Sequence, residues 1–398
     1  MHPIPYGRQD ISPQDIEAVV EVLRSPWLTQ GPTIPRFEQL VAEWCHVAHA
    51  IAVNSATSAL HIACMALGVG PGDRVWTSPT TFVASSNCAL YCGATVDFVD
   101  IDPRTYNMSV AALESKLRDA EAGGTLPKVV IPVHLCGQSC EMDAIGRLAK
   151  RYGFRVIEDA SHAIGAQYQG APVGDCRHSD ITVFSFHPVK IITTGEGGMA
   201  TTNDPDLAEA MRVHRTHGIT GKREAMEARP ESEIWNYQQV SIGFNYRMTD
   251  ISAALGVSQM RRLEEFVARR HEIADRYDSA LEKLPVIRPW QHPDTWSSYH
   301  LYPIRVRHED CGLAQREVYE TFLGEGILVN LHYIPVHRHP YYERLGFQAG
   351  DFPEAERYHR ESISLPLFPT MTTEDQDRVI AVLERTLATK GQPVASAG

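Results

Sequence analysis

The sequence predicts an α/β protein in which a large domain with a mostly parallel sheet precedes a smaller α+β domain. Between residues 49 and 157, short apolar segments typical of buried strands alternate with longer segments whose apolar residues recur at helical spacing. After about Asp250 this alternation ends, and a long helical run with interleaved Arg and Glu follows. Strand–helix alternation is typical of a parallel sheet with helices on both faces.

The expected elements follow in order. Ser12 can cap a helix over residues 12–24, and a second helix is expected over residues 34–45, after a loop rich in Gly and Pro. Strands are expected at residues 49–53, 74–77, 95–99, 128–133, 155–157 and 181–184, and helices at residues 58–67, 81–91, 110–119 and 142–152.

The C-terminal part has a different pattern. A helical run covers residues 251–284, and strand-like segments at 299–306 and 326–330 flank a helix at 315–323. We therefore expect a large domain over residues 1–250, a small domain over residues 251–388 and a disordered tail over residues 389–398.

Length and composition are those of a globular enzyme. The chain has 398 residues, of which 43% are hydrophobic and 22% charged. A formal net charge of −12 argues against a nucleic-acid or membrane-surface protein. No apolar run approaches the roughly 20 residues of a membrane span, and the N-terminus lacks the basic and apolar regions of a signal peptide. The expected location is the cytoplasm.

Neither the cysteines nor a histidine-rich tract predicts a metal site. The eight cysteines are scattered, so reduced structural thiols are expected. The tract at residues 332–342 contains several His but also prolines, and it has no carboxylate. A substrate-lining loop or a surface loop fits it better than a metal site.

One lysine and one acid follow apolar strands. Lys190 lies in a stretch of small, hydroxylated and glycine residues just after the strand at 181–184, and Asp159 comes at the end of the apolar segment that continues the strand at 155–157. Such a lysine can form a Schiff base with an aldehyde cofactor, and such an acid can face the nitrogen of a pyridinium ring. The pair predicts pyridoxal 5′-phosphate (PLP). Burial of the Lys190 stem would lower its pKa and make it a usable nucleophile and proton carrier.

Other candidate residues have two interpretations each. Ser55 and Thr57 precede a helix and suit phosphate binding, although a simple helix cap explains them as well. His162 could support Asp159 or touch the cofactor ring, or be an ordinary histidine. Phe82 could stack on the ring or belong to the core. The segment at residues 243–250 could bind anions or cap the next helix.

Together these motifs resemble the sugar-nucleotide aminotransferases of the DegT/DnrJ/EryC1/StrS family, which are PLP enzymes of the aspartate-aminotransferase fold (type I). The resemblance extends from about Ile4 to Leu387. It is carried by motifs at residues 27–31, 55–57, 158–160, 185–190, 196–198 and 243–247.

The resemblance implies a role for each matching residue. Cofactor contacts are implied for Lys190 as the Schiff-base lysine, Asp159 at the pyridine nitrogen, Ala56, Thr57 and Ser185 at the phosphate, and Phe82 on the ring. Asn245 is implied to reach the phosphate of the partner subunit, so a homodimer with shared active sites is expected. The residues implied to line the substrate are Tyr6, Pro26, Trp27, Leu28, Thr29, Arg247, Asn330, Leu331, His332 and Tyr333.

Within the family, residues 5–11, 187–190 and 332–337 are most similar to the branch that acts in pseudaminic acid biosynthesis. That similarity implies ping-pong transfer of the amino group of L-glutamate to C4 of a UDP-linked 4-keto-6-deoxy-N-acetyl sugar. The intact Lys190 favours transamination over the dehydratase branch, in which histidine replaces the lysine. Alternatives are another ketosugar, such as a UDP-4-keto-pentose or a dTDP-keto-6-deoxyhexose, and a non-aminating PLP-binding relative.

Overall fold

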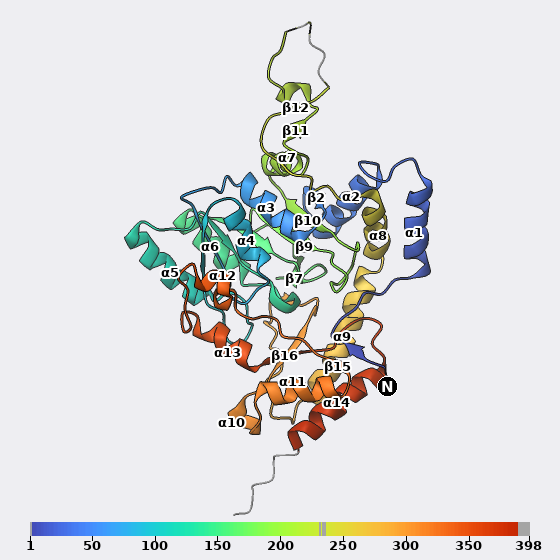
Figure 1. Ribbon diagram of the computed structural model, residues 1–398, viewed down its shortest axis with the longest axis vertical. Helices are drawn as coiled ribbons and strands as arrows, with labels where there is room; N and C mark the ends of the chain where they lie inside the picture. The colour runs from blue at the N-terminus through green and yellow to red at the C-terminus, as the bar shows by residue number, and fades with distance from the viewer. Residues whose placement is uncertain (1, 231, 233–235, 389–398) are drawn as a thin grey trace, which may run out of the picture.

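The computed structural model describes residues 2–230, 232 and 236–388 (Figure 1). A seven-stranded sheet with the order β2-β10-β9-β6-β5-β3-β4 forms the centre of the large domain. Its strands are β2 His49–Val53, β3 Arg74–Thr77, β4 Thr95–Phe98, β5 Val129–Ile131, β6 Arg155–Asp159, β9 Ile181–Ser185 and β10 Gly198–Thr202. Only β10 runs antiparallel to its neighbours, β9 and β2. The mostly parallel sheet confirms the predicted fold class.

Helices cover both faces of this sheet. Successive side chains of each strand point to opposite sides, so both faces carry apolar side chains that need to be covered. Val75 of β3 packs in one core cluster, and the next residue, Trp76, packs in another. The first face carries α3 Ala56–Ala66, α4 Ala84–Tyr91 and α7 Pro205–His214. The opposite face carries α2 Thr33–Cys45, α5 Val110–Gly123, α6 Met142–Tyr152 and α8 Asp250–Met260.

The smaller domain has a core of its own. It surrounds the antiparallel pair β14 Tyr302–Arg305 and β16 Ser362–Leu365, together with α9 Leu263–Ala280, α11 Gln315–Gly324 and α14 Thr373–Ala388. The N-terminal strand β1 Ile4–Pro5 pairs in parallel with β15 Ile327–Leu328, and the buried Ile4 lies in this same core. The first residues of the chain therefore pack with the C-terminal domain.

The helical run expected over residues 251–284 is divided into two helices, α8 and α9. They meet at Arg262, whose φ of −108° and ψ of 6° interrupt the helix and whose side chain pairs with Asp10. Residue 250, the expected domain boundary, is the first residue of α8, and α8 packs against α2 and α1 Pro13–Arg24. The tail predicted at residues 389–398 lies outside the described residues.

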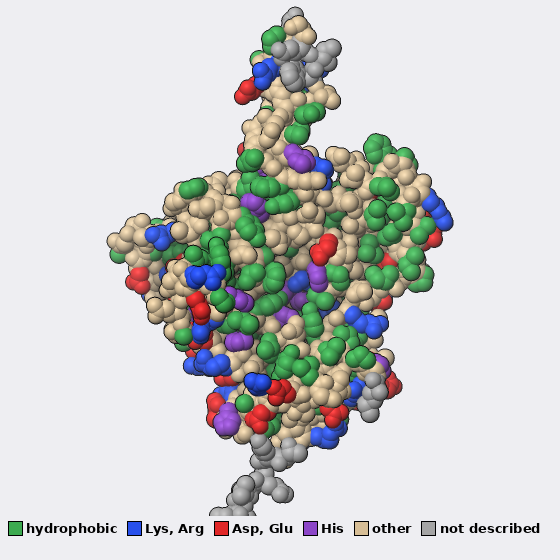
Figure 2. Space-filling view, in the orientation of Figure 1, with side chains coloured by type: hydrophobic (Ala, Val, Ile, Leu, Met, Phe, Trp, Pro, Cys, Tyr) green, Lys and Arg blue, Asp and Glu red, His purple; other side chains and the backbone are tan. Residues whose placement is uncertain are grey.

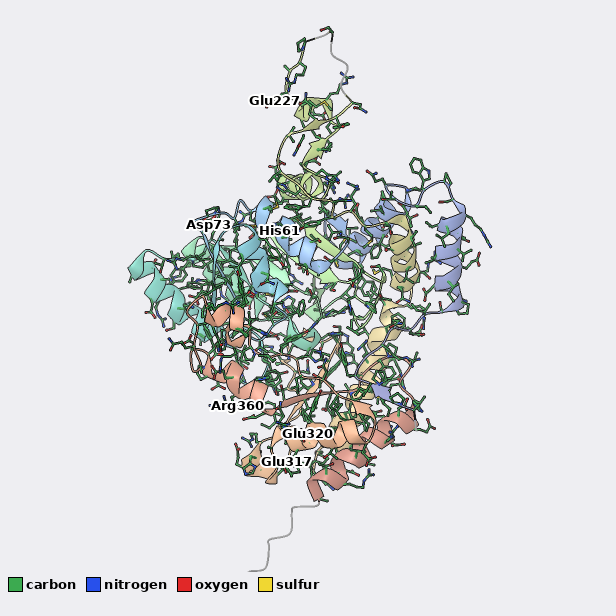
Figure 3. All side chains as sticks on the ribbon, viewed as in Figure 1. His61, Asp73, Glu227, Glu317, Glu320 and Arg360 are labelled. Atoms are coloured by element: carbon green, nitrogen blue, oxygen red, sulfur yellow. The ribbon has the colours of Figure 1, made fainter. Side chains whose placement is uncertain are left out.

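A hairpin of β11 Ile219–Thr220 and β12 Gln238–Gln239 projects from the large domain as an arm (Figure 1). Figure 3 places Glu227 on this arm and Glu317 and Glu320 on α11, at the opposite end of the molecule. Hydrophobic side chains gather near the base of the arm and over α1 (Figure 2). No helix in the described part of the chain is long and apolar enough to cross a membrane.

Candidate active site

A cavity of about 740 Å³ lies at the carboxyl ends of the parallel strands, where ligands bind in open α/β sheets. One wall comes from the large domain and includes the end of β6, the end of β9 and the start of α3. The other wall comes from Tyr6 and from residues 330–333, which follow β1 and β15 of the small domain. The site therefore lies between the two domains.

Asp159 is held at the floor of this cavity by three hydrogen bonds. The hydroxyl of Ser85 on α4 donates to Oδ2 at 2.6 Å, and the hydroxyl and amide of Ser161 donate to Oδ1 at 2.6 and 3.1 Å. The side chain is only 4% exposed. Thr81 continues the chain of hydroxyl groups, since its Oγ1 lies 2.7 Å from Oγ of Ser85. These contacts fix the direction of the carboxylate without an ion pair.

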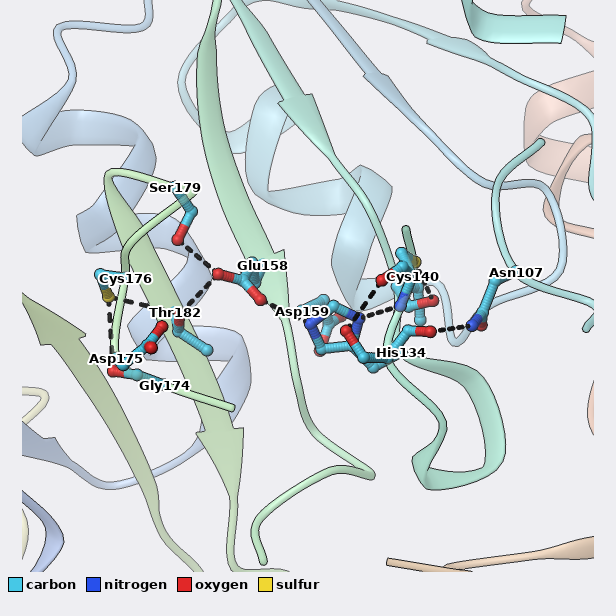
Figure 4. A network of polar contacts seen from close by, with 12 residues as sticks. Asn107, His134, Cys140, Glu158, Asp159, Gly174, Asp175, Cys176, Ser179 and Thr182 are labelled. Carbon is cyan, nitrogen blue, oxygen red and sulfur yellow. Dashed lines mark hydrogen bonds and ion pairs between the residues drawn. The ribbon is translucent and has the colours of Figure 1, made fainter. Parts of the chain in front are cut away.

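Glu158, the preceding residue of β6, faces the other side of the sheet (Figure 4). Its carboxylate accepts hydrogen bonds from His134 at 2.6 Å, from Ser179 at 2.5 Å and from Thr182 at 3.1 Å. Burial acts to raise the pKa of Glu158, but these hydrogen bonds outweigh it and lower the pKa below its usual value. The backbone amide of His134 also donates to the carbonyl of Asp159 at 3.0 Å. The network thus anchors the strand that carries Asp159.

Lys190 lies on the turn that follows β9 and lines the cavity. Burial lowers the pKa of its amine to about 8, while the charge of Asp159 acts to raise it. An amine with this pKa is partly neutral near pH 7, so it can act as a nucleophile and as a proton carrier.

The start of α3 lines the same cavity as the lysine and has the features of an anion site. Ser55 caps the helix through a hydrogen bond from the amide of Ser58, so the capping interpretation of this residue is confirmed. The first amides of a helix have no partner within the helix and attract anions. A Cβ atom built on Gly198 would lie 2.5 Å from the amide nitrogen of Ala56, so only glycine fits behind this end of the helix. Thr57 and Ser185 line the same part of the cavity.

A buried histidine joins the two walls of the cavity. The amide of Cys136 donates to Nδ1 of His162 at 3.3 Å, and Nε2 lies 3.1 Å from the hydroxyl of Tyr333. Burial and the charge of Lys190 lower the pKa of His162 well below its usual value, so the ring is neutral. With Nδ1 as an acceptor, Nε2 must carry the proton and donate it to Tyr333. The hydroxyl proton of Tyr333 is then free to point elsewhere.

The structure brings most of the candidate residues together but not all of them. Those that line the cavity are Tyr6, Ala56, Thr57, Phe82, Asp159, His162, Ser185, Lys190, Asn330, Leu331, His332 and Tyr333. Phe82 is 59% exposed, which differs from a core aromatic. Six other candidates do not line the cavity of their own chain, and all of them except Arg247 are exposed. They are Pro26, Trp27, Leu28, Thr29, Asn245 and Arg247. Thr249 caps α8, which confirms that residues 243–250 provide a cap for the next helix.

Sequence reasoning missed several polar residues of the site. Ser85 and Ser161 hold Asp159, and His187 and Glu196 line the cavity. Ser161 directly follows the motif at residues 158–160, and His187 and Glu196 lie within motifs that were recognised, so their positions were the available signal. No local sequence signal pointed to Ser85, because its contact with Asp159 spans 74 residues of chain.

A mostly parallel sheet with a partly buried lysine, a strand-end acid and a helix N-terminus at one edge is the arrangement of a PLP-dependent aminotransferase of fold type I. The chain belongs to the DegT/DnrJ/EryC1/StrS aminotransferase family, whose profile matches residues 9–384. It is therefore a sugar aminotransferase with PLP as its cofactor.

Individual relatives match nearly the whole chain. The spore coat polysaccharide biosynthesis protein SpsC of Bacillus subtilis (strain 168) is 40% identical over 382 residues, which are 95% of this chain and 96% of that protein. Helicobacter pylori PseC, an aminotransferase involved in the biosynthesis of pseudoaminic acid, superposes with a TM-score of 0.87 at 31% identity and covers 97% of this chain and 99% of its own. The PLP form of Spr1654 from Streptococcus pneumoniae has a TM-score of 0.86 at 32% identity, over 97% and 100% of the two chains.

The residues present fit PLP. The cradle at the start of α3 suits its phosphate, the buried carboxylate of Asp159 suits its ring nitrogen, and Lys190 suits its aldehyde. When bound, PLP supplies the electron sink and carries the amino group between the two substrates.

Proposed function

We propose that the enzyme transfers the amino group of L-glutamate to C4 of a UDP-linked 4-keto-6-deoxy-N-acetylhexosamine. The product is UDP-4-amino-4,6-dideoxy-N-acetyl-β-L-altrosamine, a precursor of pseudaminic acid. One observation carries this proposal. The three segments most similar to the pseudaminic acid branch all contribute to one cavity, through Tyr6, through His187 and Lys190, and through His332 and Tyr333. The likeness to PseC over 97% of the chain supports it.

A second candidate is transfer to a different nucleotide-linked ketosugar. The higher identity to SpsC, 40% against 31% for PseC, favours this alternative. Small differences in the shape of a cavity decide between such sugars.

In the proposed mechanism, Lys190 holds the aldehyde of the resting cofactor. Its freed amine would take the α-proton of the amino donor and would deliver a proton to the cofactor carbon that bore the aldehyde, and it would do the reverse with the ketosugar. Asp159 keeps the ring nitrogen protonated throughout. Tyr6 and Tyr333 line the same cavity as Lys190 and so bound the space in which the substrate would lie.

The proposal includes a homodimer in the cytoplasm with shared active sites. In it, Asn245 reaches the cofactor phosphate of the partner subunit, and residues 26–29 and Arg247 contribute to the partner's substrate site. Two features support this arrangement. Asn245 is exposed and lies outside the cavity of its own chain. Nearby, Val240 and Ile242 are 45% and 68% exposed, and neighbouring exposed apolar side chains are typical of an interaction surface.

The test is a pair of half-reactions with the PLP-loaded enzyme. L-Glutamate should convert the visible cofactor absorbance to the near-ultraviolet band of the pyridoxamine form, and a UDP-linked 4-keto sugar should restore it. Mass spectrometry and NMR of the product would identify the carbon aminated and its configuration. Restoration by a dTDP-linked ketosugar alone would support the second candidate, and no restoration by any ketosugar would contradict both.

A further inference from the structure

Two polar side chains in the cavity, His187 and Glu196, have no side-chain partner among the described residues and no assigned role. Most polar side chains that line the cavity are hydrogen-bonded within the chain. Three others, Thr57, Ser185 and Lys190, make no side-chain hydrogen bond to any described residue, and all three are assigned to the cofactor. His187 and Glu196 likewise have no described side-chain partner, and both are exposed at the mouth of the cavity. They are therefore available to a substrate.

The two residues flank the paired ends of β9 and β10. The amide of Phe186 donates to the carbonyl of Gly197 at 2.9 Å and extends the β9–β10 ladder one residue past its last pair. The carbonyl of Phe186 then accepts from the amide of Thr194 at 3.0 Å, which ends the ladder. His187 and Glu196 come next, one on each side of this end, and both line the cavity.

The turn that carries Glu196 is held in place from within. The hydroxyl of Thr194 donates to the carbonyl of Glu196 at 2.8 Å, and the amide of Gly195 donates to Oγ1 of Thr193 at 3.0 Å. In the turn that follows β9, the amide of Lys190 donates to the carbonyl of His187 at 2.9 Å. These hydrogen bonds preorganise the backbone that carries the two side chains, which reduces the conformational entropy lost when a ligand binds.

The chemistry of Glu196 distinguishes the two substrates that use this cavity in turn. Its side chain accepts hydrogen bonds from hydroxyl and amide N–H groups, and as a carboxylate it repels other anions. The amino nitrogen of a dicarboxylate donor must lie at the cofactor, so the groups it has left to offer Glu196 are two carboxylates, whereas a sugar ring offers several hydroxyl groups. The imidazole of His187, which lines the same cavity, can donate to or accept from sugar hydroxyls as well.

We propose that Glu196, together with His187 of the same cavity, binds a ring hydroxyl or amide N–H of the ketosugar and does not bind the amino donor. This inference rests on the proposed function, in which a nucleotide-linked ketosugar is the acceptor. It makes Glu196 a specificity-determining residue for the second half-reaction alone.

The experiment measures both half-reactions separately in Glu196→Gln, by stopped-flow cofactor absorbance. A hydrogen bond to a charged group is worth about tenfold to a hundredfold, so kcat/KM for the ketosugar should fall by that factor. The glutamate half-reaction should change by less than about fivefold, as for an exposed charge. Calorimetric binding of the UDP sugar to the pyridoxamine-loaded variant should weaken in parallel. His187→Asn should show the same selectivity, and the control Glu282→Gln, an exposed residue of the small domain, should change neither half-reaction.

Equal losses in both half-reactions, or an unchanged sugar half-reaction, would overturn the inference. Failure of the wild-type enzyme with UDP sugars is a different result, because it contradicts the proposed function. The variants are then compared on whichever ketosugar the wild-type enzyme accepts, and the same two criteria decide.

Discussion

Two neighbouring carboxylates of β6 lie in two different regions of the molecule. Asp159 faces the cavity, where three hydrogen bonds orient it and no described residue forms an ion pair with it. Glu158 faces the opposite side of the sheet, where His134 and two hydroxyl groups surround it in the closed network of Figure 4. The pleat of one strand thus gives adjacent acids opposite tasks.

The difference shows that the two faces of β6 serve different purposes: one faces the cofactor site, and the other stabilises the strand. A carboxylate left without an ion pair can interact with a charge that arrives with the cofactor. A carboxylate already satisfied by a protein network stabilises the chain but has no capacity left for a ligand. We therefore expect the cavity side of β6 to determine activity and the opposite side to determine stability.

Removal of Lys190 should have the largest effect on activity. Lys190→Ala should lower the overall rate by about 10⁴-fold, the upper end of the contribution of acid–base groups, because the lysine is also the nucleophile. The folded state should persist, and circular dichroism would check it. Lys150→Ala removes an exposed lysine of α6 and serves as the control. A Lys190→Ala enzyme with near wild-type turnover would assign the chemistry to another residue.

Neutralising Asp159 should have the next largest effect. In Asp159→Asn the amide can keep its contacts with Ser85 and Ser161, because hydroxyl groups both donate and accept. The variant loses only the charge beside the cofactor ring, and we expect kcat to fall by about 10²–10³-fold, as when one preorganised electrostatic contact is removed. Single-turnover absorbance measures this directly. A variant that loses stability but keeps its rate would place Asp159 in the same class as Glu158.

The sequence predicted the cavity side of this comparison better than the supporting side. Lys190 and Asp159 follow apolar strands, and parallel strands bring their carboxyl ends to one edge, so local patterns were sufficient to pair them. The turn before α3 was visible for the same reason. By contrast, the contact between Ser85 and Asp159 has no local pattern, because it depends on how α4 packs beside β6.

The domain arrangement shows the same limit. The helical pattern of residues 251–284 contains no glycine or proline near Arg262, so nothing local indicated the break between α8 and α9. The pairing of β1 with β15 joins segments more than 300 residues apart and involves only two residues from each strand. Tertiary packing determines both features, and propensity does not.

The pKa of Lys190 predicts how the apoenzyme captures PLP. Only the neutral amine attacks the aldehyde, and the pKa is lowered to about 8. The capture rate should therefore rise about tenfold from pH 7 to a plateau above pH 8–9. Asp159 acts to raise this pKa, so Asp159→Asn should shift the midpoint to lower pH. Absorbance after rapid mixing with PLP gives the profile. A midpoint near 10.4, the value of an unperturbed lysine, would contradict burial of the amine.

The smallest effect on activity is expected from Glu158→Gln, where the change is the same as at Asp159 but on the other face. We expect turnover within about threefold of wild type, and a free energy of unfolding lower by about 1.5–3 kcal/mol at pH 7, because hydrogen bonds to a buried charge are lost.

The stability difference between wild type and Glu158→Gln should depend on pH in a direction set by the pKa shift of Glu158. The folded pKa of Glu158 is lowered, so its contribution to stability is fully present above the unfolded pKa of about 4.3 and is lost as the pH falls through the folded value. The stability difference between wild type and Glu158→Gln should therefore shrink below about pH 4.3. Urea unfolding followed by tryptophan fluorescence measures it. A constant difference across this range would mean that shape, and not charge, makes the Glu158 network stabilising.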